Sequence, residues 1–192
     1  MAAACLIAAA IAALAYAYFV EPRRLVVARS ELSVLDLDPA FEGLKVVAIG
    51  DIHGGSNYVP NERLREIVEL TNAEDPDLVV LLGDYVSQKQ GGGTLPRPLK
   101  MSMMDVADGL SGLRARLGVY AVLGNHDGWY GEGFVSEQLS RVGYRVLRNE
   151  VATVDVNGTP LRIAGLIDHL KLGPEFYAGP ETARSMVAGR SE

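Results

Sequence analysis

The chain has 192 residues, of which 48% are hydrophobic and 22% charged, and its formal net charge is −6. This length suits one domain with a core of its own, and the composition excludes a disordered chain. The negative charge argues against a general nucleic-acid binder, because such a protein needs a basic surface to displace counterions from phosphates. The single cysteine, Cys5, excludes an internal disulfide and leaves the redox compartment open.

An apolar segment without charges or helix breakers opens the chain at residues 2–20. As a helix it would be about 28 Å long, close to the roughly 30 Å of a hydrocarbon core. We interpret residues 1–20 as a membrane anchor, with a cleaved signal peptide or a buried helix as alternatives. Three arginines follow the segment, Arg23, Arg24 and Arg29, which favours the cytoplasmic face for the rest of the chain.

The next residues, 21–43, are expected to form a linker with a short strand or hairpin at 25–37. Three apolar runs of strand length then alternate with two helical patterns. In chain order these lie at 44–51, 60–72, 78–84, 101–118 and 119–127. Because the strands are continuously apolar and helices connect them, we predict an α/β fold with a largely parallel sheet covered by helices.

The remaining segments are shorter. A loop rich in glycine and proline, residues 87–100, is predicted to lie on the surface near the ends of the strands. A further helix is expected, followed by three strands, at 134–143, 144–149, 151–156 and 161–168. The final residues, 173–192, show no clear periodicity and are expected to be coil or a frayed helix.

Polar side chains that can bind metal follow each of the three apolar runs. They are Asp51 and His53, then Asp84, then Asn125, His126 and Asp127. Alone, each is as well explained by turn formation. In a parallel sheet, however, the carboxyl ends of the strands share one edge, so the three groups are expected to converge.

The predicted ligands combine carboxylates, an amide oxygen and imidazole, a set that suits Mn, Fe, Zn or Mg. Asp84, on the middle strand, can bridge two ions about 3.5–4 Å apart, as phosphoryl hydrolysis in a two-metal site requires. Glycines precede each group, at Gly50, Gly83 and Gly124, and fit a need for close backbone approach or unusual dihedral angles.

The three blocks GDIHGG, GDYV and GNHD, spanning residues 50–127, resemble the signature blocks of the calcineurin-like metallophosphoesterases. With the apolar segment before them, they are most similar to a membrane-anchored bacterial branch. The Ser/Thr protein phosphatases of this superfamily instead continue as GDYVDRG and RGNHE, so that activity is disfavoured. The resemblance implies a layered sandwich fold over residues 44–192.

The resemblance also implies a role for each residue of the three blocks. Two divalent ions would be bound by Asp51, His53, Asp84 and Asn125, with Asp84 bridging them. His126 would protonate the leaving oxygen or contact the phosphate, held in place by Asp127, and these two form the predicted catalytic pair.

Three aromatic residues flank the blocks, and one further histidine lies beyond them. Tyr58, Trp129 and Tyr130 are candidates to line a substrate pocket, with simple packing as the alternative. His169 matches no ligand block and is expected to be a surface or pocket-wall residue.

Two later blocks of the family pattern, H-x-P and G-H-x-H, do not occur in this sequence, which holds three histidines. We therefore expect a truncated chain whose second sheet is incomplete at the C-terminus and whose metal binding and turnover are weak. An incomplete second sheet would leave apolar surface uncovered on the first.

The leading hypothesis is a membrane-associated, metal-dependent hydrolase of phosphoester or pyrophosphate bonds. The resemblance makes a lipid headgroup such as UDP-2,3-diacylglucosamine, of the lipid A pathway, the most plausible substrate. The alternative is a catalytically impaired fragment or a membrane-tethered interaction module. A nuclease of the same superfamily is disfavoured by the acidic balance, and no nucleic-acid partner is expected.

Overall fold

The computed structural model describes residues 1–56, 58–87, 101–168, 184–186 and 188. The chain divides into two compact units, Met1–Ser33 and Val34–Glu192. The loop predicted at 87–100 lies almost wholly outside the described residues, as do His169 and most of the segment 173–192.

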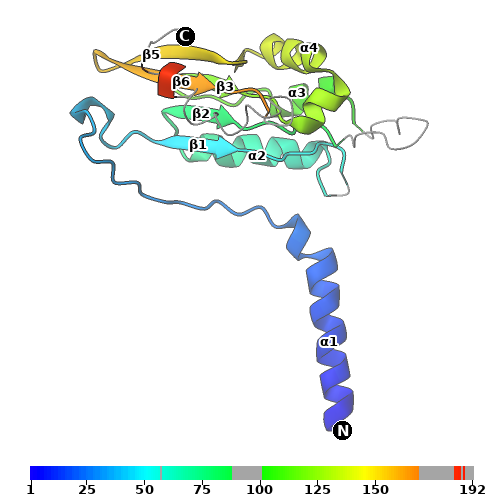
Figure 1. Ribbon diagram of the computed structural model, residues 1–192. Helices are drawn as coiled ribbons and strands as arrows, with labels where there is room; N and C mark the ends of the chain where they lie inside the picture. The colour runs from blue at the N-terminus through cyan, green and yellow to red at the C-terminus, as the bar shows by residue number, and fades with distance from the viewer. Residues whose placement is uncertain (57, 88–100, 169–183, 187, 189–192) are drawn as a thin grey trace. The chain divides into compact units, whose positions relative to one another are not determined.

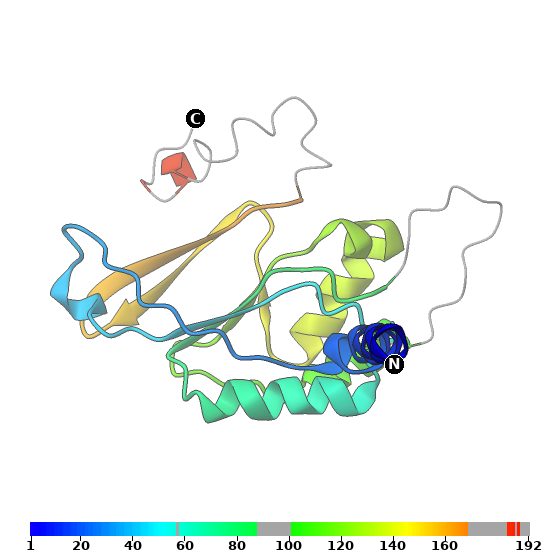
Figure 2. The ribbon, with the colours of Figure 1, turned by 90° about the horizontal axis from the view of Figure 1, so that it is seen from below.

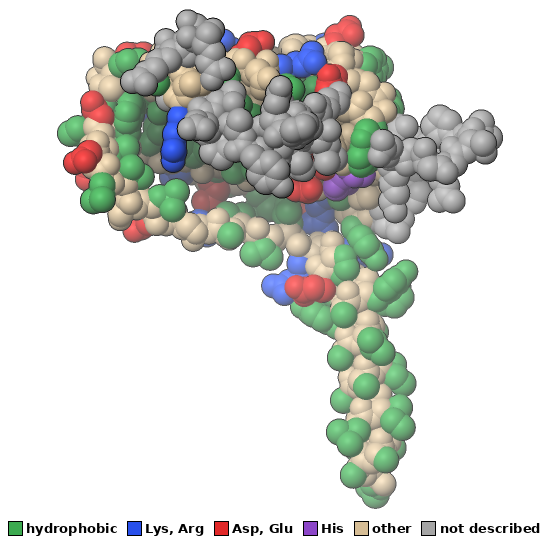
Figure 3. Space-filling view, in the orientation of Figure 1, with side chains coloured by type: hydrophobic (Ala, Val, Ile, Leu, Met, Phe, Trp, Pro, Cys, Tyr) green, Lys and Arg blue, Asp and Glu red, His purple; other side chains and the backbone are tan. Residues whose placement is uncertain are grey.

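The first unit is dominated by one helix, α1 (Ala2–Phe19), followed by a short 3-10 turn, η1 (Glu21–Arg23). Apolar side chains cover α1 along its length, and charged side chains appear only after its end (Figure 3). Pro22 has no backbone N–H to donate to the carbonyl four residues earlier, at Tyr18, so the α-helical hydrogen bonds cannot continue through it. Within the described part of the chain, this is the one helix long and apolar enough to cross a membrane, judged by length and composition.

The prediction of a strand or hairpin at 25–37 is wrong, because these residues, all of them described, form coil and one turn. Their apolar side chains are exposed, Leu32 and Leu35 almost completely. Alternation of apolar and polar residues is not sufficient for a strand, since a strand also needs a neighbour to satisfy its backbone amides and carbonyls.

The second unit is built on a four-stranded sheet in the order β1-β2-β3-β4, with every neighbouring pair parallel (Figures 1 and 2). The strands are β1 (Val46–Ile49), β2 (Leu78–Leu81), β3 (Val119–Ala121) and β4 (Arg145–Val146). This confirms the predicted parallel α/β arrangement.

Three helices connect the strands: α2 (Asn61–Ala73), α3 (Met103–Leu110) and α4 (Asn125–Arg141). One face of the sheet packs against them. The core there joins Val79 and Leu81 of β2 to Leu64 of α2, Val106 of α3 and Val135 of α4. The start predicted for α2 is confirmed, since the helix begins at Asn61 directly after Pro60.

The other face of the sheet packs against a hairpin of β5 (Glu150–Val156) and β6 (Thr159–Gly165), which pair antiparallel. The contact joins Leu78 and Tyr120 of the sheet to Ala152 of the hairpin. Successive strand residues point to opposite faces, so alternate positions of β2 serve the two layers. On the sheet, Val46 is 48% exposed, and Leu82, just after β2, is 56% exposed.

Two predicted helix boundaries were wrong. The pattern at 101–118 predicts a helix up to Gly118, but α3 ends at Leu110 and Gly112 has a φ of 100°. Asn72 of α2 explains the stop, because its side chain bonds the Gly112 carbonyl at 2.8 Å and the Arg114 amide at 3.1 Å. The next helix begins at Asn125 rather than at 134, with a kink at Gly131.

Candidate functional site

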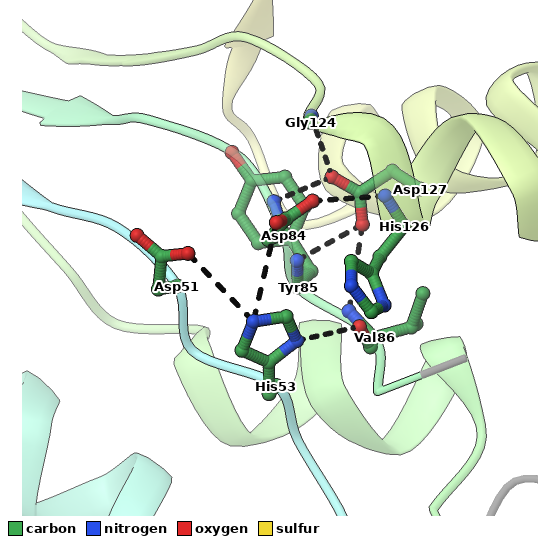
Figure 4. A network of polar contacts seen from close by, with 8 residues as sticks. All are labelled: Asp51, His53, Asp84, Tyr85, Val86, Gly124, His126 and Asp127. Carbon is green, nitrogen blue, oxygen red and sulfur yellow. Dashed lines mark hydrogen bonds and ion pairs between the residues drawn. The ribbon is translucent and has the colours of Figure 1, made fainter. Parts of the chain in front are cut away.

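The carboxyl ends of β1, β2 and β3 bring the predicted site residues together. Asp51 and His53 follow β1, Asp84 follows β2, and His126 lies in the first turn of α4, which follows β3 (Figure 4). The convergence expected from the parallel sheet is therefore present in the structure.

Three of these residues have left-handed backbone conformations. The φ angles are 53° at Asp51, 47° at His53 and 58° at Asp84. Side chains other than glycine rarely adopt this region, and such residues cluster at functional sites, where surrounding contacts hold them.

A backbone carbonyl orients the His53 ring. Its Nδ1 donates to the Val86 carbonyl at 3.1 Å, which leaves Nε2 as the free ring atom. That Nε2 lies 3.7 Å from Asp51 Oδ1 and 3.9 Å from Asp84 Oδ2. The Asp84 carboxylate is mostly buried, whereas the Asp51 side chain is 83% exposed.

His126 faces the same point from the first turn of α4, after β3. Its ring centroid lies 4.6 Å from that of His53, edge to face, and 4.8 Å from that of Trp129. The His126 backbone amide donates to Asp84 Oδ1 at 2.9 Å. Its Nδ1 is buried and, among the residues that the structure describes, has no hydrogen-bond partner, which is unusual for a polar atom and is consistent with a ligand at this point.

These donors fit a divalent ion. One ligand atom from each of His53, Asp84 and His126 lies within 4.8 Å of the other two. Bonds of about 2.1 Å allow two ligands of one ion to be up to about 4.2 Å apart, and a pair of ions spans more. Asp51 is within this reach of His53. His126, predicted to act on the leaving group, thus belongs to the metal-capable cluster.

Asp127 does not hold His126 as predicted. Its carboxylate is fully buried and accepts hydrogen bonds from the backbone amides of Gly124, Asp84, Tyr85 and, at 3.4 Å, Val86. Asp127 is the third residue of α4, so its side chain turns back toward the helix start. Burial raises the pKa of its carboxyl group, and the four amides partly offset that rise.

Two of the three glycines are required by the packing. A Cβ at Gly83 would overlap the Gly124 backbone, and a Cβ at Gly124 would overlap the Asp84 carboxylate. Gly83 also has a φ of 97°. At Gly50 the atoms nearest to an added Cβ belong to the Leu82 side chain, the first at 3.2 Å. The predicted need for a glycine is therefore weaker at this position.

Of the predicted pocket residues Tyr58, Trp129 and Tyr130, Trp129 contacts a residue of the metal-capable cluster. Asn125 is half-buried as the first residue of α4, next to His126. Trp129 lies against the His126 ring, but Tyr130 packs against the core and near Phe134. Tyr58 is half-buried between β1 and α2.

Sequence reasoning missed the two residues that follow Asp84. Tyr85 is fully buried and its hydroxyl donates to the Val122 carbonyl at 2.9 Å, while Val86 provides the carbonyl that orients His53. The available signal was an aromatic and an apolar residue directly after Asp84, where a surface turn would be polar.

Comparison with known proteins gives several relatives of similar kind. The metallophosphoesterase YkuE of Bacillus subtilis is 29% identical over 85% of this chain and 54% of its own length. A transmembrane protein with a metallophosphoesterase domain from Danio rerio is 30% identical over 65% of this chain and 26% of its own. The UDP-2,3-diacylglucosamine pyrophosphatase LpxG of Chlamydia trachomatis is 28% identical over 64% and 34%.

The chain thus spans about half the length of YkuE, and less of the other two relatives. The calcineurin-like phosphoesterase profile matches residues 44–180, which include the whole metal-capable cluster. The chain belongs to the calcineurin-like phosphoesterase family.

Proposed function

We propose that the chain is a membrane-associated hydrolase that cleaves a phosphoester or pyrophosphate bond with the help of two divalent ions. One observation carries this proposal: the ligand atoms of His53, Asp84 and His126 meet within 4.8 Å at the carboxyl edge of a parallel sheet. That edge is where such sheets bind ligands.

The protein groups have distinct roles in this proposal. Asp51, His53, Asp84 and Asn125 hold the ions, and Asp84 is central because both His53 and the His126 amide contact its carboxylate. When bound, such ions neutralise phosphate charge and lower the pKa of water. His126 binds the phosphate or protonates the leaving oxygen, and its half-buried ring is held between His53 and Trp129.

The proposed substrate is a phosphorylated lipid headgroup, of which UDP-2,3-diacylglucosamine is the first to test. The apolar helix α1 supports a location at a membrane, where such a headgroup is presented. LpxG is named for this substrate, and the Danio rerio relative is named as a transmembrane protein. The arginines after α1 favour the cytoplasmic face.

The test is hydrolysis by the full chain in detergent micelles, with and without Mn²⁺, Zn²⁺ or Mg²⁺. UDP-2,3-diacylglucosamine and bis(p-nitrophenyl) phosphate are the substrates, and phosphorus NMR identifies the products. We expect metal-dependent turnover of at least one of them, and faster turnover of the lipid. Asp84→Asn should abolish both activities.

Two results would contradict the proposal. Turnover that survives Asp84→Asn would show that a contaminating hydrolase is responsible. Metal-induced thermal stabilisation without hydrolysis of either substrate would favour a metal-binding interaction module instead, because a ligand that binds only the folded state must stabilise it.

A further inference from the structure

We infer that Asp127 is the positioning residue of the site, holding Asp84 directly and His53 through the segment 83–86. The inference rests on the proposed function for its biological meaning, but its physical content concerns the chain alone. The Asp127 carboxylate was predicted to hold His126, but in the structure it accepts hydrogen bonds from backbone amides.

In the part of the chain that the structure describes, residues 84–86 have no neighbouring strand on the side of β3. Strand β3 ends at Ala121, and the Val122 amide still donates to the Leu81 carbonyl at 2.9 Å. The chain then turns at Gly124 into α4, so β3 does not continue beside residues 84–86. Buried amides must nevertheless find acceptors.

The Asp127 carboxylate takes the place of that strand. Oδ2 accepts from the amides of Asp84 at 2.8 Å and Gly124 at 2.9 Å. Oδ1 accepts from the amide of Tyr85 at 2.9 Å and, more weakly, from that of Val86 at 3.4 Å. Figure 4 shows the carboxylate between the Gly124 backbone and the backbone of Asp84 and Tyr85, with dashed lines to both.

The other side of segment 83–86 contacts the loop that follows β1. The carbonyls of Gly83, Asp84 and Tyr85 accept from the loop that follows β1, from Asp51 at 3.2 Å, His53 at 2.9 Å and Gly54 at 2.8 Å. The Val86 carbonyl accepts from His53 Nδ1. Segment 83–86 therefore transmits the position of Asp127 to both metal-capable loops.

Asp84 and His53 both have left-handed φ angles, which are unfavourable for residues other than glycine and persist only where contacts hold them. With an asparagine at 127, one acceptor oxygen would remain for four amides, and the new NH₂ group would face an amide hydrogen. Relaxation of residues 84–86 should then free the His53 ring.

The experiment uses the full chain, metal-free in detergent micelles and labelled with ¹⁵N. The variants are Asp127→Asn and, as a matched control, Asp77→Asn, because Asp77 also accepts a backbone amide, that of Lys45, at the opposite end of β2. The readouts are the His53 imidazole ¹⁵N shifts, which report the tautomer, and the Mn²⁺ affinity by titration calorimetry.

We expect His53 to carry its proton on Nδ1 in the wild type and in Asp77→Asn, and to become a mixture of tautomers in Asp127→Asn. The Mn²⁺ affinity should fall about 10- to 100-fold in Asp127→Asn alone, as for other residues that orient metal ligands. An unchanged His53 tautomer and Mn²⁺ affinity in Asp127→Asn would overturn the inference.

Because Asp127→Asn can fail to fold, the wild type supplies a second test by hydrogen exchange. The amides of Asp84 and Tyr85 should exchange as slowly as those of β2, and exchange at the rate of an exposed loop would overturn the inference. Neither the tautomer nor the exchange measurement needs turnover. If both agree and nothing is hydrolysed, the positioning role stands and the proposed function falls.

Discussion

An aspartate side chain binds the backbone near each end of β2. Asp77 contributes to stability alone, whereas we infer that Asp127 also positions the proposed metal site. Asp77 precedes the strand, is partly exposed, and accepts from the Lys45 amide at 3.0 Å and from the Arg116 guanidinium at 2.9 Å. Asp127 reaches the other end from α4, is fully buried, and its hydrogen bonds in the structure come from backbone amides.

The pKa values of the two carboxyl groups respond in opposite directions. The hydrogen bond from the Lys45 amide, helped by Arg116, lowers the pKa of Asp77. Burial raises the pKa of Asp127 more than its amide partners lower it. A backbone amide, helped by the Arg116 guanidinium, thus stabilises the carboxylate at the amino end of β2. At the carboxyl end, burial makes the carboxylate of Asp127 less favourable, as is common at functional sites.

The largest effect is expected for Asp84→Asn at the carboxyl end. Loss of the carboxylate that we propose to bridge the ions should lower Mn²⁺ affinity at least about 100-fold and remove the metal-dependent rise in stability, about 2.7 kcal/mol at 100 times the Kd. Thermal unfolding with and without Mn²⁺ measures this. The same Mn²⁺-dependent shift in variant and wild type would place the ions elsewhere.

Gly124→Ala and Gly118→Ala compare the two ends of β3 with the same added methyl group. At Gly124 the Cβ would overlap the Asp84 carboxylate, which should cost about 1–3 kcal/mol and lower Mn²⁺ affinity about tenfold or more. At Gly118 the Cβ has room, but the φ of 102° should cost about 1 kcal/mol.

Denaturant unfolding and calorimetry on both variants test this comparison. Equal losses of Mn²⁺ affinity in Gly118→Ala and Gly124→Ala would mean that general destabilisation, not displacement of Asp84, controls metal binding.

A smaller effect is expected for Asp77→Asn. The variant weakens the contacts to Lys45 and Arg116 at a partly exposed site, so the unfolding free energy should fall by about 1 kcal/mol. For a chain of this size that is roughly 2–4 °C in Tm. Mn²⁺ affinity should not change, and a change would show that the two ends of β2 are coupled.

The smallest expected effect is a change with pH in the difference in unfolding free energy between the wild type and Asp77→Asn. Because the pKa of Asp77 in the folded state lies below its ordinary value of 3.8, its contribution is fully present above pH 3.8. It is lost as the pH falls through the lowered folded-state pKa. The gap in unfolding free energy between wild type and Asp77→Asn should therefore be constant near neutral pH and shrink in acid. A gap that widens in acid would reverse the sign of the shift.

Much of the sheet and the cluster was predictable from the sequence because both depend on local patterns. Continuous apolar runs predicted β1, β2 and β3, and the shared carboxyl edge of parallel strands predicted that Asp51, His53 and Asp84 would meet. The helical pattern at 60–72 also gave the start of α2 correctly.

The errors arose where a distant contact decides the local structure. The periodicity that predicts a helix to Gly118 is real, since Leu113 is buried, but the Asn72 side chain ends α3 earlier. The alternating pattern at 25–37 lacks a strand partner in the structure and forms no strand.

By itself, the sequence determined which residues can bind metal, in what order they occur and on which kind of sheet they lie, because strand periodicity and strand-end chemistry are properties of short segments. Only the tertiary structure decided what each residue does there. Asp127 is adjacent to His126 in the chain, yet its carboxylate bonds the amides of Asp84 and Tyr85, which are over forty positions away in the chain. The buried amides of Asp84 and Tyr85 have no neighbouring strand among the described residues to accept their hydrogen bonds, so a side chain must accept them. These amides become buried only when the strands pack together, so the need for this acceptor cannot be read from the sequence.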